Sequence, residues 1–215
     1  MLVISSARSN DGKTSVACGL GGAFSKLGLS FEFVKVGPDY IDSMCAGLFA
    51  CVNRLNLITS CSQRFLSWLA WAHPCSLVED NMGMVDFATS GVLIATVHLS
   101  IEVNRLVLVV NCGSGLQTCA VLVQALRFKL SGVVLNGVSS RKHEVIMEWA
   151  IVWWLGLPIL GTVHKQSRMF GKQYLGIALP FEAKGSECFV DDLTLGLYCS
   201  CNASKLLQLL LVGVG

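Results

Sequence analysis

The sequence has few charged residues for its length. Asp, Glu, Lys and Arg make up 14% of its 215 residues, against about 25% in an average soluble domain. Hydrophobic residues make up 53%, which excludes an intrinsically disordered chain. The length is ample for one domain with a large buried core. Such sparse charge predicts either segments that are buried on every face or a chain that meets an apolar phase.

We predict no membrane span and no signal peptide. The apolar runs 149–163 and 206–215 fall short of the roughly 18 to 20 residues that a spanning helix needs, and Gly156 and Pro158 interrupt the first run. Residues 1–6 have no basic stretch ahead of their apolar residues and no small-residue cleavage site behind them. We therefore expect a cytoplasmic protein.

Signatures of zinc, disulfides and nucleic-acid binding are also missing. There is no C-x-x-C motif, and Cys199 and Cys201 have neither a second ligand pair nor a nearby histidine. Cys18, Cys112 and Cys119 lie in apolar or glycine-rich stretches, where a small buried side chain fits. We therefore interpret the ten cysteines as core residues. A net charge of +2 without a cluster of Lys and Arg predicts no nucleic-acid partner.

What is present is an alternation of strand-like and helix-like segments. Runs such as LVLVVN and GVVLN are apolar throughout, as in strands that are covered on both faces. The alternation predicts an α/β fold, a doubly wound parallel sheet with helices on both faces. We expect strands at 2–5, 31–36, 77–79, 106–111, 132–136 and 159–163, and helices at 13–27, 63–72, 116–128, 143–155 and 191–211. Ligands of such folds bind at the carboxyl ends of the strands.

The chain divides near its end. Residues 182–187 are the one plausible linker. We expect one domain at 1–182, followed by a linker and a C-terminal helix within 183–215.

A polar loop, SARSNDGKT at residues 6–14, follows the first predicted strand and opens a helix. This is the context of a phosphate-binding loop, in which backbone N–H groups and the helix N-terminus face the anion. Gly12, Lys13, Thr14 and Ser15 would bind the nucleotide. Lys13 would reach the terminal phosphates, and the Thr14 hydroxyl would hold Mg²⁺.

The loop departs from the usual pattern in two ways. The earlier glycine is replaced by Ser6 or Ala7, depending on the variant of the pattern, and Asp11 places a carboxylate beside the phosphate cradle. An Asn-Asp-Gly turn that caps an ordinary helix is the alternative interpretation.

Acidic residues follow two other predicted strands. Asp39 and Asp42 come after the second strand, and Glu79 ends the third, with Asp86 seven residues further on. Paired carboxylates at a strand end suit Mg²⁺ coordination or proton removal from an attacking amine. Glu79 stands where a metal-organising acid stands in phosphate-loop folds. A solvated acidic turn is the alternative for Asp39 and Asp42.

Several segments together resemble one family. Residues 35–42, KVGPDYID, closely resemble the signature of the cobyrinic acid a,c-diamide synthase family. Residues 78–86, VEDNMGMVD, resemble a second segment of that family, and LVLVVN, GVVLNGVSSRKH and YLGIALPFE resemble later ones in the same order. On these motifs the chain is identified as the synthetase domain of this family, which belongs to the dethiobiotin synthetase-like P-loop amidoligases.

The resemblance implies a P-loop NTPase-like fold and a carbon–nitrogen ligase that uses ATP and Mg²⁺. Such an enzyme activates corrinoid side-chain carboxylates as acyl phosphates, which ammonia converts to amides. The resemblance implies catalytic roles for Lys13, Asp39, Asp42 and Asp86, metal contacts from Thr14, Asp39 and Glu79, and a nucleotide-base contact from Asn136. For Asn136 the alternative is a role in closing the turn at the strand end.

Other features keep alternatives open. Family members continue into a glutaminase domain, but no histidine follows His164 here, so we expect ammonia from solution or from a separate glutaminase chain. Arg8 lies five residues before Lys13, where partition-type ATPases, which act as dimers, carry a signature lysine. Glycines of the family pattern are replaced here, as at Ser6, and a truncated, non-catalytic nucleotide-binding relative is therefore a further alternative. A dethiobiotin synthetase shares the loop but not residues 35–42.

Overall fold

The computed structural model describes residues 1–36, 53–57, 75–80, 83–84, 105–126, 130–165, 186–200 and 203–211. Within these residues the chain forms one seven-stranded sheet in the order β3-β2-β4-β1-β5-β6-β7, and every neighbouring pair is parallel. The strands are β1 (Leu2–Ser6), β2 (Glu32–Val36), β3 (Asn53–Leu57), β4 (Ser76–Glu79), β5 (Leu106–Asn111), β6 (Leu130–Val138) and β7 (Ile159–His164). The predicted doubly wound α/β fold is confirmed.

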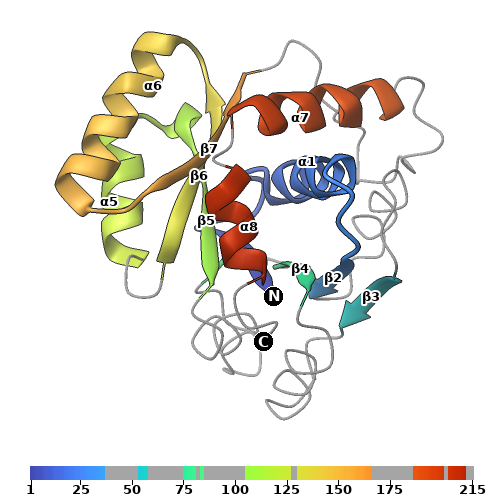
Figure 1. Ribbon diagram of the computed structural model, residues 1–215. Helices are drawn as coiled ribbons and strands as arrows, with labels where there is room; N and C mark the ends of the chain where they lie inside the picture. Colours follow the sequence, from blue (N-terminus) through green and yellow to red (C-terminus); the bar gives the residue numbers. More distant parts are fainter. Residues whose placement is uncertain are drawn as a thin grey trace.

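Each face of the sheet carries its own hydrophobic core. Helices α1 (Lys13–Lys26), α7 (Ser186–Ser200) and α8 (Ala203–Leu211) cover one face, and α1 and α7 lie side by side (Figure 1). Helices α5 (Leu116–Leu126) and α6 (Arg141–Glu148) cover the other, with a short 3-10 turn η2 (Cys112–Ser114) and a π-helix η3 (Trp149–Trp154). Leu2 and Ile4 of β1 enter the first core, whereas Val3 enters the second. Burial on both faces therefore explains the sparse charge.

The predicted strands are all present, but the sequence analysis missed β3. Its residues, NRLNL, include two Asn and one Arg, and they lack the apolar run that marks the central strands. Among the described strands, β3 lies at the edge of the sheet and pairs only with β2. An edge strand needs less apolar surface than a central one, which is why the pattern failed there.

The helices also differ from the predictions at their ends. The helix predicted at 143–155 begins at Arg141, because Ser140 caps it by accepting a hydrogen bond from the backbone N–H of His143 at 3.2 Å. The helix predicted at 191–211 is two helices, α7 and α8, and α7 starts at Ser186, within the predicted linker. The rest of that linker, and the helix predicted at 63–72, lie outside the described residues.

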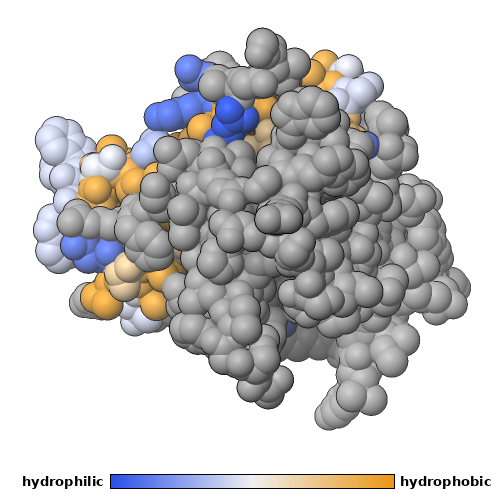
Figure 2. All heavy atoms as spheres, turned by 90° about the horizontal axis from the view of Figure 1, so that it is seen from below, coloured by the Kyte–Doolittle hydropathy of each residue, from blue (hydrophilic) through white to orange (hydrophobic). Residues whose placement is uncertain are grey.

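Cys18, Cys112 and Cys119 are buried, free thiols, as predicted. Cys199 is exposed, so the interpretation of all ten cysteines as core residues is wrong for this residue. Among the described helices, none combines the length and apolarity needed to cross a bilayer. Exposed hydrophobic side chains nonetheless gather on the side formed by α5, α6 and η3 (Figure 2). There Trp149 and Trp153 stack with ring centroids 5.2 Å apart.

Candidate functional site

The candidate site lies where β1 ends and α1 begins. Two residues of the connecting loop have positive φ, Asn10 at 65° and Gly12 at 93°. This left-handed conformation is open to glycine and tolerated by asparagine. A Cβ atom at Gly12 would also collide with the side-chain amide of Asn136. Glycine at position 12 is therefore required by both conformation and space.

Lys13, the first residue of α1, is 5% exposed and turns back over the loop. Its Nζ donates to Ser6 Oγ at 3.0 Å and to the Arg8 carbonyl at 3.4 Å. Burial lowers the pKa of Lys13, and the charge of Lys35 lowers it further, whereas Asp80, Glu79 and Asp11 raise it. Burial of the charged ammonium group at the loop is therefore unfavourable, and a bound anion would compensate for it.

Thr14 and Glu79 meet across the site. The Thr14 hydroxyl donates to Glu79 Oε1 at 2.6 Å, so the loop and the end of β4 are in direct contact. A hydroxyl and a carboxylate oxygen are ligands that suit Mg²⁺. The structure therefore brings together two of the three predicted metal ligands; the third, Asp39, lies outside the described residues.

Lys35 is a site residue that the sequence analysis missed. It pairs with Glu79 in the register of β2 and β4, and its Nζ lies 2.9 Å from Glu79 Oε1 and 3.1 Å from the Asp80 carbonyl. Both side chains are almost fully buried, at 1% and 0% exposure. A lysine within the apolar run FEFVKV is the signal that could have revealed it, because a buried ammonium needs a partner.

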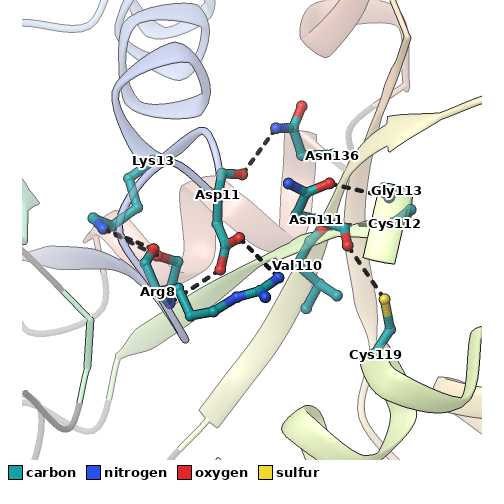
Figure 3. A network of polar contacts seen from close by, with 10 residues as sticks. Arg8, Asp11, Lys13, Val110, Asn111, Cys112, Gly113, Cys119 and Asn136 are labelled. Atoms are coloured by element: carbon teal, nitrogen blue, oxygen red, sulfur yellow. Dashed lines mark hydrogen bonds and ion pairs between the residues drawn. The ribbon is translucent and has the colours of Figure 1, made fainter. Parts of the chain in front are cut away.

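The loop also satisfies several of its own polar groups (Figure 3). The carboxylate of Asp11 accepts a hydrogen bond from the Arg8 backbone N–H at 3.0 Å and lies 3.5 Å from the Arg8 guanidinium. Asn136, from the carboxyl end of β6, donates through Nδ2 to the Asp11 carbonyl at 2.9 Å. Asn136 thus fixes the loop, and its contact with a nucleotide base stays a prediction.

The structure gathers most of the described site candidates at one edge of the sheet. Thr14 contacts Glu79, and the Asn136 amide lies against Gly12. Lys13 bonds to the loop, and Ser15 follows it, half-buried, in the first turn of α1. Asp39, Asp42 and Asp86 lie outside the described residues. Asp80, the residue after Glu79, is buried and accepts a hydrogen bond from Ser5 Oγ at 2.5 Å.

The parallel sheet and the loop at the start of α1 define an α/β protein of the P-loop NTPase type. The chain belongs to the CobQ/CobB/MinD/ParA nucleotide-binding domain family, whose model matches residues 2–172.

Named relatives confirm the resemblance to a,c-diamide synthases. The chain is 30% identical to a cobyrinate a,c-diamide synthase of Synechococcus, over 92% of this chain and 46% of that protein. It is 32% identical to a hydrogenobyrinate a,c-diamide synthase of Streptomyces coelicolor, over 86% of this chain and 40% of that protein. The chain therefore spans about half the length of the curated relatives that it matches.

Solved structures share the fold at low sequence identity. The cell-division protein MinD of Aquifex aeolicus is 15% identical, with a TM-score of 0.53 over 89% of this chain and 94% of that one. Chloroplast FtsY of Physcomitrella patens is 14% identical, with a TM-score of 0.52 over 89% of this chain and 64% of that one. These likenesses support the P-loop NTPase-like fold.

Proposed function

We propose that this chain is the ATP- and Mg²⁺-dependent synthetase domain of a corrinoid amidoligase that acts on the carboxylates of cobyrinic acid or a related corrinoid. The observation that carries the proposal is the meeting of Thr14 and Lys35 at Glu79, at the carboxyl edge of β1, β2 and β4. Lys13, the residue before Thr14, lies over the adjoining loop. Two cations with a hydroxyl and a carboxylate suit a triphosphate and its metal. The names of the relatives supply the substrate class.

The proposed reaction has two steps. A substrate carboxylate attacks the terminal phosphorus of ATP, which gives an acyl phosphate and ADP. Ammonia then attacks the acyl carbon, phosphate leaves, and an amide remains. Phosphorylation matters because an oxide ion leaves poorly, whereas phosphate leaves well. The ammonia comes from solution or from a glutaminase on a separate chain.

The residues divide the work of the first step. Lys13 moves from Ser6 and the Arg8 carbonyl to the phosphates, where its charge offsets the charge that gathers on the transferring group. Thr14 and Glu79 would hold Mg²⁺, which would neutralise phosphate charge. Lys35 shares Glu79 Oε1 with Thr14, so its ammonium group would lie beside these metal ligands and add a second positive charge near the phosphates.

The remaining roles rest on the family likeness. Asp39 joins the metal ligands, Asp39 or Asp42 orients the metal or the incoming ammonia, and Asp86 lies near the reacting carboxylate. Asn136, next to the loop through its bond to Asp11, contacts the nucleotide base. We also propose a cytoplasmic enzyme that acts alone or as a homodimer.

The test is the dependence of ADP formation on both co-substrates. The purified chain is incubated with Mg-ATP, cobyrinic acid and ammonium, and ADP and the amide product are measured as each component is omitted. We expect sustained ADP formation, beyond one ADP per protein molecule, only when both the corrinoid and ammonium are present. ATP turnover that responds to neither would contradict the ligase. Nucleotide-dependent dimerisation without amide formation would favour a partition-type ATPase, which the position of Arg8 also suggests.

A further inference from the structure

The phosphate-binding loop already holds an anion of its own. Asp11 is 4% exposed, and its carboxylate points back at the loop that should receive the phosphates (Figure 3). One oxygen accepts the Arg8 backbone N–H at 3.0 Å, and the other lies 3.5 Å from Arg8 Nη2. Loops of this kind bind phosphate through such N–H groups. The carboxylate therefore occupies a backbone donor within this loop.

We propose that Asp11 is a built-in competitor of nucleotide phosphate, which sets the affinity of the loop and must swing away before a triphosphate can bind. This inference rests on the proposed function, because it assumes that the loop binds nucleotide. It assigns Asp11 a role that the usual loop pattern does not contain, namely that of a residue whose negative charge lowers the affinity of the loop for phosphate.

The local structure allows the side chain to move while the backbone stays in place. The Asp11 carbonyl is held by Asn136 Nδ2 at 2.9 Å, and Gly12, which has a φ of 93°, lies against the same amide group. The loop is thus anchored by main-chain contacts that do not involve the carboxylate. Rotation of the Asp11 side chain alone would open the Arg8 N–H to a phosphate oxygen.

Charge makes coexistence of the two anions costly. A carboxylate and a phosphate at the same donor repel each other strongly in a buried site. Arg8 offsets this repulsion in part, since its guanidinium neutralises Asp11 from the solvent side, where the Arg8 side chain is 53% exposed. Two substitutions in one ion pair should therefore move phosphate affinity in opposite directions. If the pair only stabilised the loop, both substitutions would weaken binding.

The experiment is a calorimetric titration of the whole chain with Mg-ATP and, separately, with tripolyphosphate. The variants are Asp11→Asn, Arg8→Met and, as the control for the loop itself, Lys13→Met. Tripolyphosphate isolates the loop from contacts to the base. We expect Asp11→Asn to bind both ligands at least tenfold tighter than the wild type, and Arg8→Met to bind both more weakly. Circular dichroism and the melting temperature confirm that each variant is folded, and Asp11→Ser replaces Asp11→Asn if the latter does not fold.

A second condition separates contact from long-range charge. Salt at about 0.5 M shortens the range of electrostatic interactions to a few ångströms. If Asp11→Asn binds phosphate more tightly because no carboxylate has to be displaced, its higher affinity persists in salt. If the higher affinity comes from a remote charge, it disappears. Equal or weaker binding by Asp11→Asn, or a gain that vanishes in salt, would overturn the inference. If wild type and Asp11→Asn bind equally and both need Lys13, the proposed function stands and the inference fails. If neither binds, both fail.

Discussion

At the scale of single residues, the pair formed by Lys35 and Glu79 is central because it is both buried and shared with Thr14. Removing one partner of a buried pair leaves a charge without compensation, which costs about 3–5 kcal/mol. We expect Lys35→Met to lower the free energy of unfolding by about that amount, measured by urea denaturation. The double variant Lys35→Met/Glu79→Gln should lose much less than the two single variants combined. Strictly additive losses would show that the two side chains do not interact.

Lys13 gives the opposite expectation for stability. Burial lowers its pKa, so at neutral pH the folded chain carries an ammonium that its surroundings disfavour. Lys13→Met should therefore keep or raise the melting temperature while it abolishes any stabilisation by Mg-ATP. The cost in the wild type should decline as the pH rises toward 10.5, the ordinary pKa of lysine. A Lys13→Met chain that melts well below the wild type would contradict this reading.

Only some of the site residues could be predicted from the sequence. The Gly12-Lys13-Thr14 motif and Glu79 were visible because each follows an apolar strand. Lys35 could be recognised only as a lysine within an apolar run. Its partner Glu79 could not be predicted, because the pairing depends on the register of β2 and β4, and register is a property of the folded sheet. The bond between Asn136 and Asp11 joins residues 125 positions apart, and no local pattern predicts it.

At the scale of elements, the contact between α1 and α7 depends on Gly22. A Cβ atom there would collide with Thr194 of α7, which is 2% exposed. Gly22→Ala should therefore destabilise the chain by about 1–3 kcal/mol, although alanine favours a helix by about 1 kcal/mol over glycine. Gly196→Ala is the matched control, since a Cβ atom at this exposed position of α7 meets nothing within 4 Å, and it should stabilise. Denaturant unfolding measures both, and destabilisation by both would contradict the packing argument.

Glu144, in the first turn of α6, makes a pH-dependent contribution to the stability of the fold. Burial alone would raise the pKa of Glu144, but hydrogen bonds from Arg141 and Thr162 and the charges of Arg141 and His164 bring it below its ordinary value of 4.5. A lowered carboxyl pKa stabilises the fold above the unfolded value, and this contribution is lost as the pH falls through the folded value.

We therefore expect the free energy of unfolding of the wild type to exceed that of Glu144→Gln at neutral pH, and the difference to shrink below pH 4.5. Denaturant titrations at several pH values measure it. Glu148→Gln is the control for the loss of a carboxylate from the same helix, because Glu148 is 39% exposed and lies 4.0 Å from Arg141. A difference that is constant with pH, or that grows as the pH falls, would contradict the argument.

Elements were more predictable than contacts. The central strands were found because they are apolar on both faces, and α1 and α5 because helical periodicity follows a loop. The edge strand β3 escaped, since its polar residues resemble a loop. The split of the final helix into α7 and α8 escaped as well, because the apolar pattern alone does not show where a helix is interrupted.

At the scale of the whole molecule, the chain places the two helix layers and the loop around one parallel sheet, and the site lies at the carboxyl edge of that sheet. The family likeness supplied what physical pattern could not, namely a substrate class. The proposed ligase, the competitor role of Asp11 and the part played by Lys35 all assume that this edge binds a nucleotide with its metal.

The most direct test of that assumption is a calorimetric titration of the folded chain with ATP, with and without Mg²⁺, on the wild type and on Lys13→Met. We predict saturable binding that Mg²⁺ strengthens, and we predict its loss in Lys13→Met while the fold is retained. Absence of binding in the wild type and in Asp11→Asn, or binding that does not depend on Lys13, would contradict a working phosphate-binding loop.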